Sequence, residues 1–203
     1  RGWQLLGDGY AYRIEAERIL DGRLPGTLHP PGWTFVMAVP GLVGLDALRY
    51  QQIMAALIGT AVVVVVGLAA RAMFDGRVGL TAAALAAVYP NLWLYEREVL
   101  SEPLAMLCVA TMLWLVVWFR SAPNAYRSAA LGAAVGLSAL VRSELIAIAA
   151  LVVLPLVLSR TGFRLSVRCL WLGIAGLACL LPLAPWFAYN STRYERPVLL
   201  STG

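Results

Sequence analysis

The sequence predicts an all-α, polytopic integral membrane protein, and three observations predict it. Hydrophobic residues make up 61% of the 203 residues, whereas charged residues make up 13%; a soluble domain carries about 25% charged residues. Mean hydropathy is +0.76. Apolar stretches of about the length of a spanning helix recur along the whole chain. These features exclude the disordered, collagen-like and disulfide-rich classes.

The first 49 residues predict an outer loop with two short juxtamembrane helices. Apolar residues from Tyr12 to Leu20 follow helical spacing, which predicts an amphipathic helix between residues 9 and 22 that lies in the membrane interface and ends at a glycine. Residues 33–45 are apolar but too few to span a bilayer, and they include Pro40. We therefore expect a second helix there that is interfacial or re-entrant.

Six further stretches predict spanning helices. They lie at about residues 50–74, 78–95, 103–119, 128–143, 145–159 and 169–189. Residues 128–158 can alternatively form one long helix. That helix would bury Arg142 and Glu144 near the middle of the membrane, at a cost of several kcal/mol unless the two pair. The charge of the loops favours two shorter helices that turn near Arg142.

Loop charge also predicts the orientation in the membrane. With two helices between residues 128 and 158, three loops share one side, and they hold seven of the sixteen Arg residues but a single acid, Asp75. Positively charged loops face the cytoplasm, so the opposite side, with ten of the eleven acids including Glu195, is extracytoplasmic in a plasma-membrane protein. No basic stripe indicates nucleic-acid binding.

The chain predicts a single transmembrane domain. It starts at Arg1 without an initiator Met, and it stops at Gly203 shortly after an apolar stretch. We therefore expect an internal fragment that lacks a first span and a C-terminal part, in which residues 190–203 begin an outer loop. The three cysteines lack CxxC spacing and His29 is the only histidine, which argues against disulfide bonds and a zinc site.

Asp8, in the stretch GDGYAY together with Tyr10, has two interpretations. Because it comes just before a predicted helix, it can be an N-cap that accepts hydrogen bonds from the first turn. Its flanking glycines also let a ligand approach the backbone. There the carboxylate would act as a general base toward an acceptor hydroxyl.

Glu102 and the pair Arg142 and Glu144 are the other charged candidates. Glu102 follows Ser101, an expected N-cap, into the edge of the membrane, and together with Asp8 it can hold a polar substrate or a divalent cation. Arg142 and Glu144 lie where two predicted helices meet. They form either a structural ion pair or a site in which Arg142 binds a phosphate through its planar guanidinium.

Residues 185–203 end the last predicted span. Trp186, Tyr189 and Tyr194 suit an aromatic belt at the membrane interface. Asn190 begins a glycosylation sequon, a match short enough to arise by chance.

Four stretches occur in order on one predicted side, GDGYAY, HPPG, YP…SEPL and LVRSEL, and PW…N…STG closes them. In this pattern the chain resembles the membrane-embedded GT-C glycosyltransferases of the protein-mannosyltransferase and aminoarabinose-transferase group. The resemblance covers essentially the whole chain. It implies a GT-C-like helical bundle with juxtamembrane helices in its first outer loop.

The resemblance implies an enzyme that moves a sugar, with inversion, from a polyprenyl-phosphate donor to an acceptor hydroxyl of a lipid, protein or glycan. It implies Asp8 as the catalytic base and Arg142 as the phosphate ligand, with Arg193 near the place where Tyr189 replaces an expected arginine. The other implied substrate-binding residues are Tyr10, His29, Glu102, Glu144 and Asn190. The one cofactor that the resemblance allows, without requiring it, is a divalent cation bound by Asp8 and Glu102. A transporter or channel subunit with an Arg–Glu pair in the membrane is the alternative.

Overall fold

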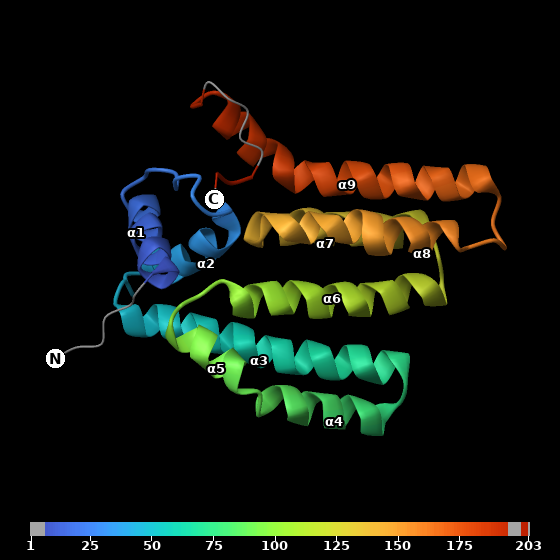
Figure 1. The fold of residues 1–203 in the computed structure, drawn as a ribbon, viewed down its shortest axis with the longest axis horizontal. Coiled ribbons are helices and arrows are strands. Elements are labelled where there is room, and N and C mark those ends of the chain that lie inside the picture. The colour runs from blue at the N-terminus through green and yellow to red at the C-terminus, as the bar shows by residue number, and fades with distance from the viewer. Residues whose placement is uncertain (1–6, 195–199, 203) are drawn as a thin grey trace.

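The computed structural model describes residues 7–194 and 200–202, and every regular element within them is helical. Long helices lie side by side, and two short helices pack across one end of the bundle (Figure 1). The prediction of an all-α membrane protein is therefore confirmed. Arg1 and Glu195, which entered the predictions about chain ends and charge, lie outside the described residues.

The two short helices are α1 (Asp8–Leu20) and α2 (Pro31–Leu42), which pack against each other as the two expected juxtamembrane elements. Each is followed by a glycine with left-handed backbone, Gly22 (φ 74°) and Gly44 (φ 78°). The N–H of the residue after each glycine donates to the carbonyl five residues back. This bond is typical of a Schellman motif, which ends a helix sharply and explains why both stay short.

Three helices are long and apolar enough to cross a bilayer in the part of the chain that the structure describes. They are α3 (Leu48–Met73), α6 (Glu102–Ser121) and α9 (Leu165–Ser191). They coincide with three of the six predicted spans. The other three predicted spans are shorter or broken.

The span predicted at residues 78–95 is two helices, α4 (Gly76–Ala87) and α5 (Pro90–Arg97), which are bent by 48° relative to each other. Pro90 causes the break. Proline disfavours helical backbone in the residue before it, and Tyr89 is extended (φ −75°, ψ 113°).

The two-helix interpretation of residues 128–158 is confirmed, because the chain reverses at Arg142. This residue has extended backbone (φ −144°, ψ 121°) directly after α7. The returning segment is less regular than the expected helix at 145–159, since it joins a 3₁₀ turn, a π-helical turn and a short α-helix. The bounds are α7 (Ala125–Val141), η1 (Ser143–Ile146), η2 (Ala149–Val153) and α8 (Leu154–Leu158).

Helices α7 and α9 form the most extensive contact between elements. Two glycines of α7 lie directly against the α9 backbone. A Cβ atom on Gly132 would come within 1.9 Å of the Ala175 carbonyl oxygen, and one on Gly136 within 2.2 Å of that of Cys179. Small residues allow such close approach of helices in lipid. The adjoining apolar core contains Phe119, Leu131, Val135, Val153, Val157 and Trp171.

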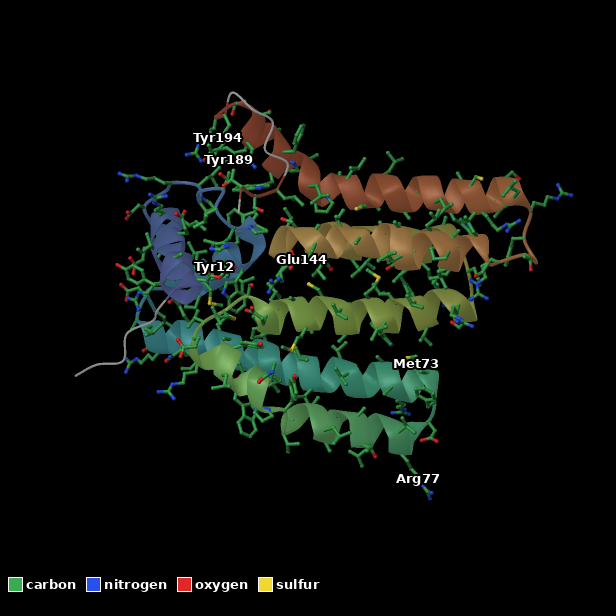
Figure 2. The ribbon with its side chains drawn as sticks, in the orientation of Figure 1. Tyr12, Met73, Arg77, Glu144, Tyr189 and Tyr194 are labelled. Atoms are coloured by element: carbon green, nitrogen blue, oxygen red, sulfur yellow. The ribbon has the colours of Figure 1, made fainter. Side chains whose placement is uncertain are left out.

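The two ends of the bundle differ in composition. The connections that follow α3, α6 and α8 meet at one end, as expected from their Arg residues (Figure 1). Met73 and Arg77 lie at this end, whereas Tyr12, Glu144, Tyr189 and Tyr194 lie at the other (Figure 2). The short helices and the candidate acids are therefore gathered at the end opposite the arginine-rich loops.

Candidate functional site

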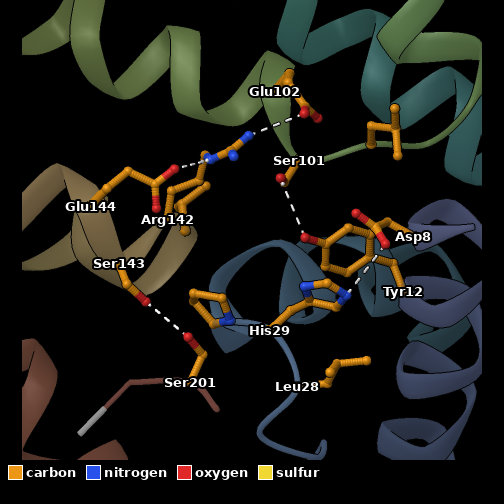
Figure 3. Close-up of a pocket in the computed structure, with 13 residues that line it drawn as sticks. Asp8, Tyr12, Leu28, His29, Ser101, Glu102, Arg142, Ser143, Glu144 and Ser201 are labelled. Atoms are coloured by element: carbon orange, nitrogen blue, oxygen red, sulfur yellow. Dashed lines mark hydrogen bonds and ion pairs between the residues drawn. The ribbon is translucent and has the colours of Figure 1, made fainter. Parts of the chain in front are cut away.

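A polar pocket of about 270 Å³ lies at the end of the bundle that carries α1 and α2 (Figure 3). Five separate segments build it: α1, the loop before α2, the start of α6, the turn after α7, and residues 200–202. Its lining residues are Asp8, Tyr12, Leu28, His29, Pro30, Leu100, Ser101, Glu102, Val141, Arg142, Ser143, Glu144 and Ser201.

Arg142 bridges two carboxylates on one wall of the pocket. Its Nη1 lies 3.1 Å from Glu102 Oε1, and its Nε donates to Glu144 Oε1 at 2.6 Å. The extended backbone of Arg142 at the end of α7 turns its side chain toward the start of α6. With Asp8, the pocket holds three carboxylates and one guanidinium, a formal charge of −2 without His29.

Asp8 and His29 form the opposite wall. Asp8 is the first residue of α1, and Gly7 occupies the N-cap position, so the N-cap interpretation of Asp8 was wrong. The Asp8 Oδ1 atom lies 3.8 Å from His29 Nε2, which is too far for a hydrogen bond. His29 Nε2 is buried without a hydrogen-bond partner. The Asp8 side chain is 67% exposed, which leaves it accessible to an incoming group.

Tyr12 connects the two walls. Its ring lies against that of His29, with centroids 4.8 Å apart, and its hydroxyl donates to Ser101 Oγ over a long 3.4 Å. Burial raises the pKa of Tyr12, more than the hydrogen bond to Ser101 lowers it. Tyr12 is therefore a neutral donor at physiological pH. Ser101 occupies the expected N-cap position of α6, yet its side chain makes no capping hydrogen bond.

A strained turn places Ser101 and Glu102 in the pocket. Val99 has φ 57°, a left-handed conformation that is a genuine outlier for a β-branched residue. Its side chain is fully buried, and its carbonyl accepts a 2.8 Å hydrogen bond from Trp33 Nε1. Such strain persists only where the surrounding structure enforces it. Here α2 holds the turn that leads into α6.

Residues 200–202 close one side of the pocket. The Thr202 N–H donates to the Thr27 carbonyl at 2.7 Å, and Trp186 Nε1 donates to the Leu200 carbonyl at 2.9 Å. Between them, Ser201 Oγ lies 3.1 Å from Ser143 Oγ. These contacts join a segment after α9 to the loop before α2 and to the turn after α7.

Five of the predicted site residues line this pocket: Asp8, His29, Glu102, Arg142 and Glu144. The other three do not. Tyr10 is 57% exposed on α1. Asn190 is fully buried in α9, and neither atom of its side-chain amide has a hydrogen-bond partner. Arg193 stacks on the rings of Tyr189 and Tyr194, with Cζ 4.9 and 5.7 Å from their centroids.

Sequence reasoning missed the neutral members of the pocket. The sequence predicts Tyr12 only on the apolar face of a helix and Ser101 only as an N-cap. Ser143 and Ser201 belong to two of the predicted motifs, LVRSEL and STG. Their place in these motifs was the one sequence feature that could have indicated them as site residues. No spacing rule, however, predicts contact between serines 58 positions apart.

An apolar groove of about 670 Å³ begins at the same wall. Residues from α3, α4, α5 and α6 line it, and Glu102 is the single charged residue among them. Glu102 therefore belongs to both the polar pocket and the groove. The remaining lining residues are Val62, Val66, Ala82, Leu85, Ala86, Tyr89, Leu92, Ala105, Met106, Val109, Ala110 and Leu113.

The arrangement does not by itself define a metal site. Across residues 7–194 and 200–202, no group of three or more His, Cys, Asp or Glu side chains is placed to hold a metal ion. Asp8 and Glu102, the two residues considered for a cation, lie on opposite walls of the pocket (Figure 3).

The model of one protein family, dolichyl-phosphate-mannose-protein mannosyltransferase, matches residues 28–189, about four fifths of the chain. The matched region contains His29, Glu102, Arg142 and Glu144. Asp8 precedes it, and Asn190 and Arg193 follow it. Neither the curated proteins nor the solved structures contain a significant match to the chain.

Proposed function

Because the chain belongs to the dolichyl-phosphate-mannose-protein mannosyltransferase family, a family of membrane glycosyltransferases, we propose that it transfers a sugar from a polyprenyl-phosphate donor to an acceptor hydroxyl. The acceptor is a lipid, protein or glycan on the extracytoplasmic side of the plasma membrane, and the reaction inverts the anomeric carbon. Family membership favours this function over the transporter or channel alternative.

The observation that carries the proposal is the junction of the polar pocket with the apolar groove at Glu102. A polyprenyl-phosphate sugar is apolar over its chain and polar at one end. The groove would take the chain in contact with lipid, and the pocket would take the sugar and phosphate. A pocket of about 270 Å³ leaves room for a single sugar ring rather than a long glycan.

Asp8 acts as the general base in this proposal. Its carboxylate takes the proton of the acceptor hydroxyl while the hydroxyl oxygen attacks the anomeric carbon from the face opposite the phosphate. The bond between the anomeric carbon and the phosphate oxygen breaks, and polyprenyl phosphate leaves with the bonding electrons. His29 lies on the same wall, and its Nε2 atom, which has no hydrogen-bond partner, is placed to orient the sugar.

Arg142 binds the departing phosphate, whose negative charge increases as the bond breaks. A guanidinium suits this role because its planar donors match phosphate oxygens. Glu102, which borders both compartments, orients the sugar or a bound cation. Tyr10, Asn190 and Arg193 lie outside the pocket, so their proposed contact with substrate is limited to parts of the acceptor or donor that extend beyond it.

The test is turnover by the full-length protein in proteoliposomes supplied with a panel of polyprenyl-phosphate sugars, followed as release of polyprenyl phosphate. Asp8→Asn should lower turnover at least 10²-fold, about 3 kcal/mol of barrier, since general-base catalysis typically contributes 10²–10⁴-fold. Asp21→Asn is the matched control, because Asp21 is an exposed carboxylate at the other end of α1. Equal turnover in both variants would remove Asp8 as the base.

A further inference from the structure

Arg142 uses only part of its hydrogen-bonding capacity on its two acids. Nε and Nη1 contact Glu144 and Glu102, and Nη2 makes no hydrogen bond within the described residues. A guanidinium has five N–H donors, so several remain for a ligand. Its charge, however, is already outweighed by the two carboxylates.

The two acids on Arg142 are not equivalent. Glu102 is 29% exposed and borders the apolar groove, whereas Glu144 is 63% exposed and does not. The second carboxylate oxygen of Glu102, Oε2, is buried without a hydrogen-bond partner. A buried, unpaired carboxylate oxygen is costly. The Glu102 carboxylate thus lies at the end of the groove with a hydrogen bond to one of its two oxygens and none to the other.

A ligand whose apolar chain fills the groove would bring its anionic end to this same place. We propose that the phosphate of the donor binds Arg142 by displacing the Glu102 carboxylate, so that Glu102 sets the affinity for the donor. This inference rests on the proposed function and deepens it. Two anions in one place repel each other, and the pocket already carries a formal charge of −2 without His29. Once displaced, the Glu102 carboxylate is free to accept a hydrogen bond from the sugar.

The direct test is the Kd of sugar-free polyprenyl phosphate for the full-length protein in nanodiscs. Glu102→Gln keeps the shape and one acceptor but removes the competing charge. We expect binding about tenfold tighter than in the wild type, equivalent to 1.4 kcal/mol. Glu17→Gln is the matched control, because it removes the same charge from an arginine-paired carboxylate of α1 that does not line the pocket, and its Kd should stay within about twofold. Arg142→Gln should abolish binding.

A second variant tests the position of the chain without touching the charges. Val109 lines the groove and is 39% exposed, so Val109→Phe narrows the groove without filling a buried site. We expect it to weaken polyprenyl phosphate binding and to leave the binding of a two-isoprenoid phosphate unchanged. In steady-state turnover, Glu102→Gln should lower both KM and kcat, because the donor binds better but the sugar is held by a neutral acceptor in place of a charged one.

An unchanged or weaker Kd in folded Glu102→Gln would overturn the inference. So would equal binding by the wild type and Arg142→Gln, since the phosphate would then bind elsewhere. The proposed function is judged separately by the turnover of wild type and Asp8→Asn. A donor that is turned over while Glu102→Gln binds no better would leave the transferase function intact and refute the displacement.

Discussion

Gly132→Ala should separate α7 from α9 and destabilise the bundle. The added Cβ would lie 1.9 Å from the Ala175 carbonyl oxygen and 2.7 Å from its Cα. Ordinary contact begins at 3.4 Å, so the two helices would have to separate by about 1.5 Å. The obstacle is backbone rather than a flexible side chain, and no rotamer change relieves it.

The cost follows from this geometry. Overpacking a well-packed site typically costs 1–3 kcal/mol, and a rigid backbone obstacle places Gly132→Ala at about 2–3 kcal/mol. For a chain of this size, each kcal/mol corresponds to roughly 2–4 °C in Tm, which gives a fall of roughly 4–12 °C. Turnover should fall as well, because α7 positions Arg142 at its end.

The assay is thermal unfolding in detergent, together with polyprenyl phosphate release. Gly176→Ala is the matched control: it makes the same chemical change on α9, where an added Cβ meets nothing within 4 Å. That variant should keep or slightly raise the Tm, since alanine favours helix over glycine. A Gly132→Ala protein as stable as Gly176→Ala would show that the two helices are not held at this distance, and the packing argument would fail.

Three further substitutions test the surroundings of the pocket. Trp33→Phe leaves the buried Val99 carbonyl without its hydrogen-bond donor, so the free energy of unfolding should fall by about 1–3 kcal/mol and turnover should fall with it. A fall in that free energy of less than about 0.5 kcal/mol would contradict the conclusion that α2 enforces the turn at Val99. Tyr12→Phe should reduce the loss of stability at alkaline pH. Burial raises the Tyr12 pKa above its usual 10.0 in the folded protein, so the wild type loses stability as pH rises above about 10, whereas the variant lacks this group. Parallel curves of Tm against pH for the two proteins would refute this. Arg193→Ala should keep the donor KM within about twofold, because its guanidinium stacks on two tyrosines outside the pocket; a tenfold rise would place phosphate there.

The helices were predictable where their cause is local. Hydropathy over about 20 residues indicates α3, α6 and α9. The arginine-rich loops, together with the cost of burying Arg142 in lipid, indicate the reversal at the end of α7. The bend between α4 and α5 also has a local cause in Pro90, but hydropathy alone runs across it and suggested one span. The π-helical turn at Ala149–Val153 has no comparable sequence signal.

The charged half of the site was predictable and the neutral half was not. A charge near lipid is rare and costly, so Glu102, Arg142 and Glu144 were conspicuous in the sequence. Hydroxyl groups are common in any sequence, and those of Tyr12 and Ser101 meet only because the helices that carry them fold together. The left-handed Val99 was unpredictable for a further reason, because valine is among the residues least expected in that conformation.

The hydrogen bond from Thr202 to Thr27 joins residues 175 positions apart. During synthesis, α1 and α2 leave the ribosome long before their partner in this contact exists. Every helix of the bundle must be made and inserted before Ser201 can meet Ser143 and complete the wall of the pocket. A nascent chain therefore cannot form this wall of the pocket until α9 is in place. A chain whose synthesis has not passed α9 lacks the segment that joins Ser143 and Thr27, so one wall of its pocket is missing.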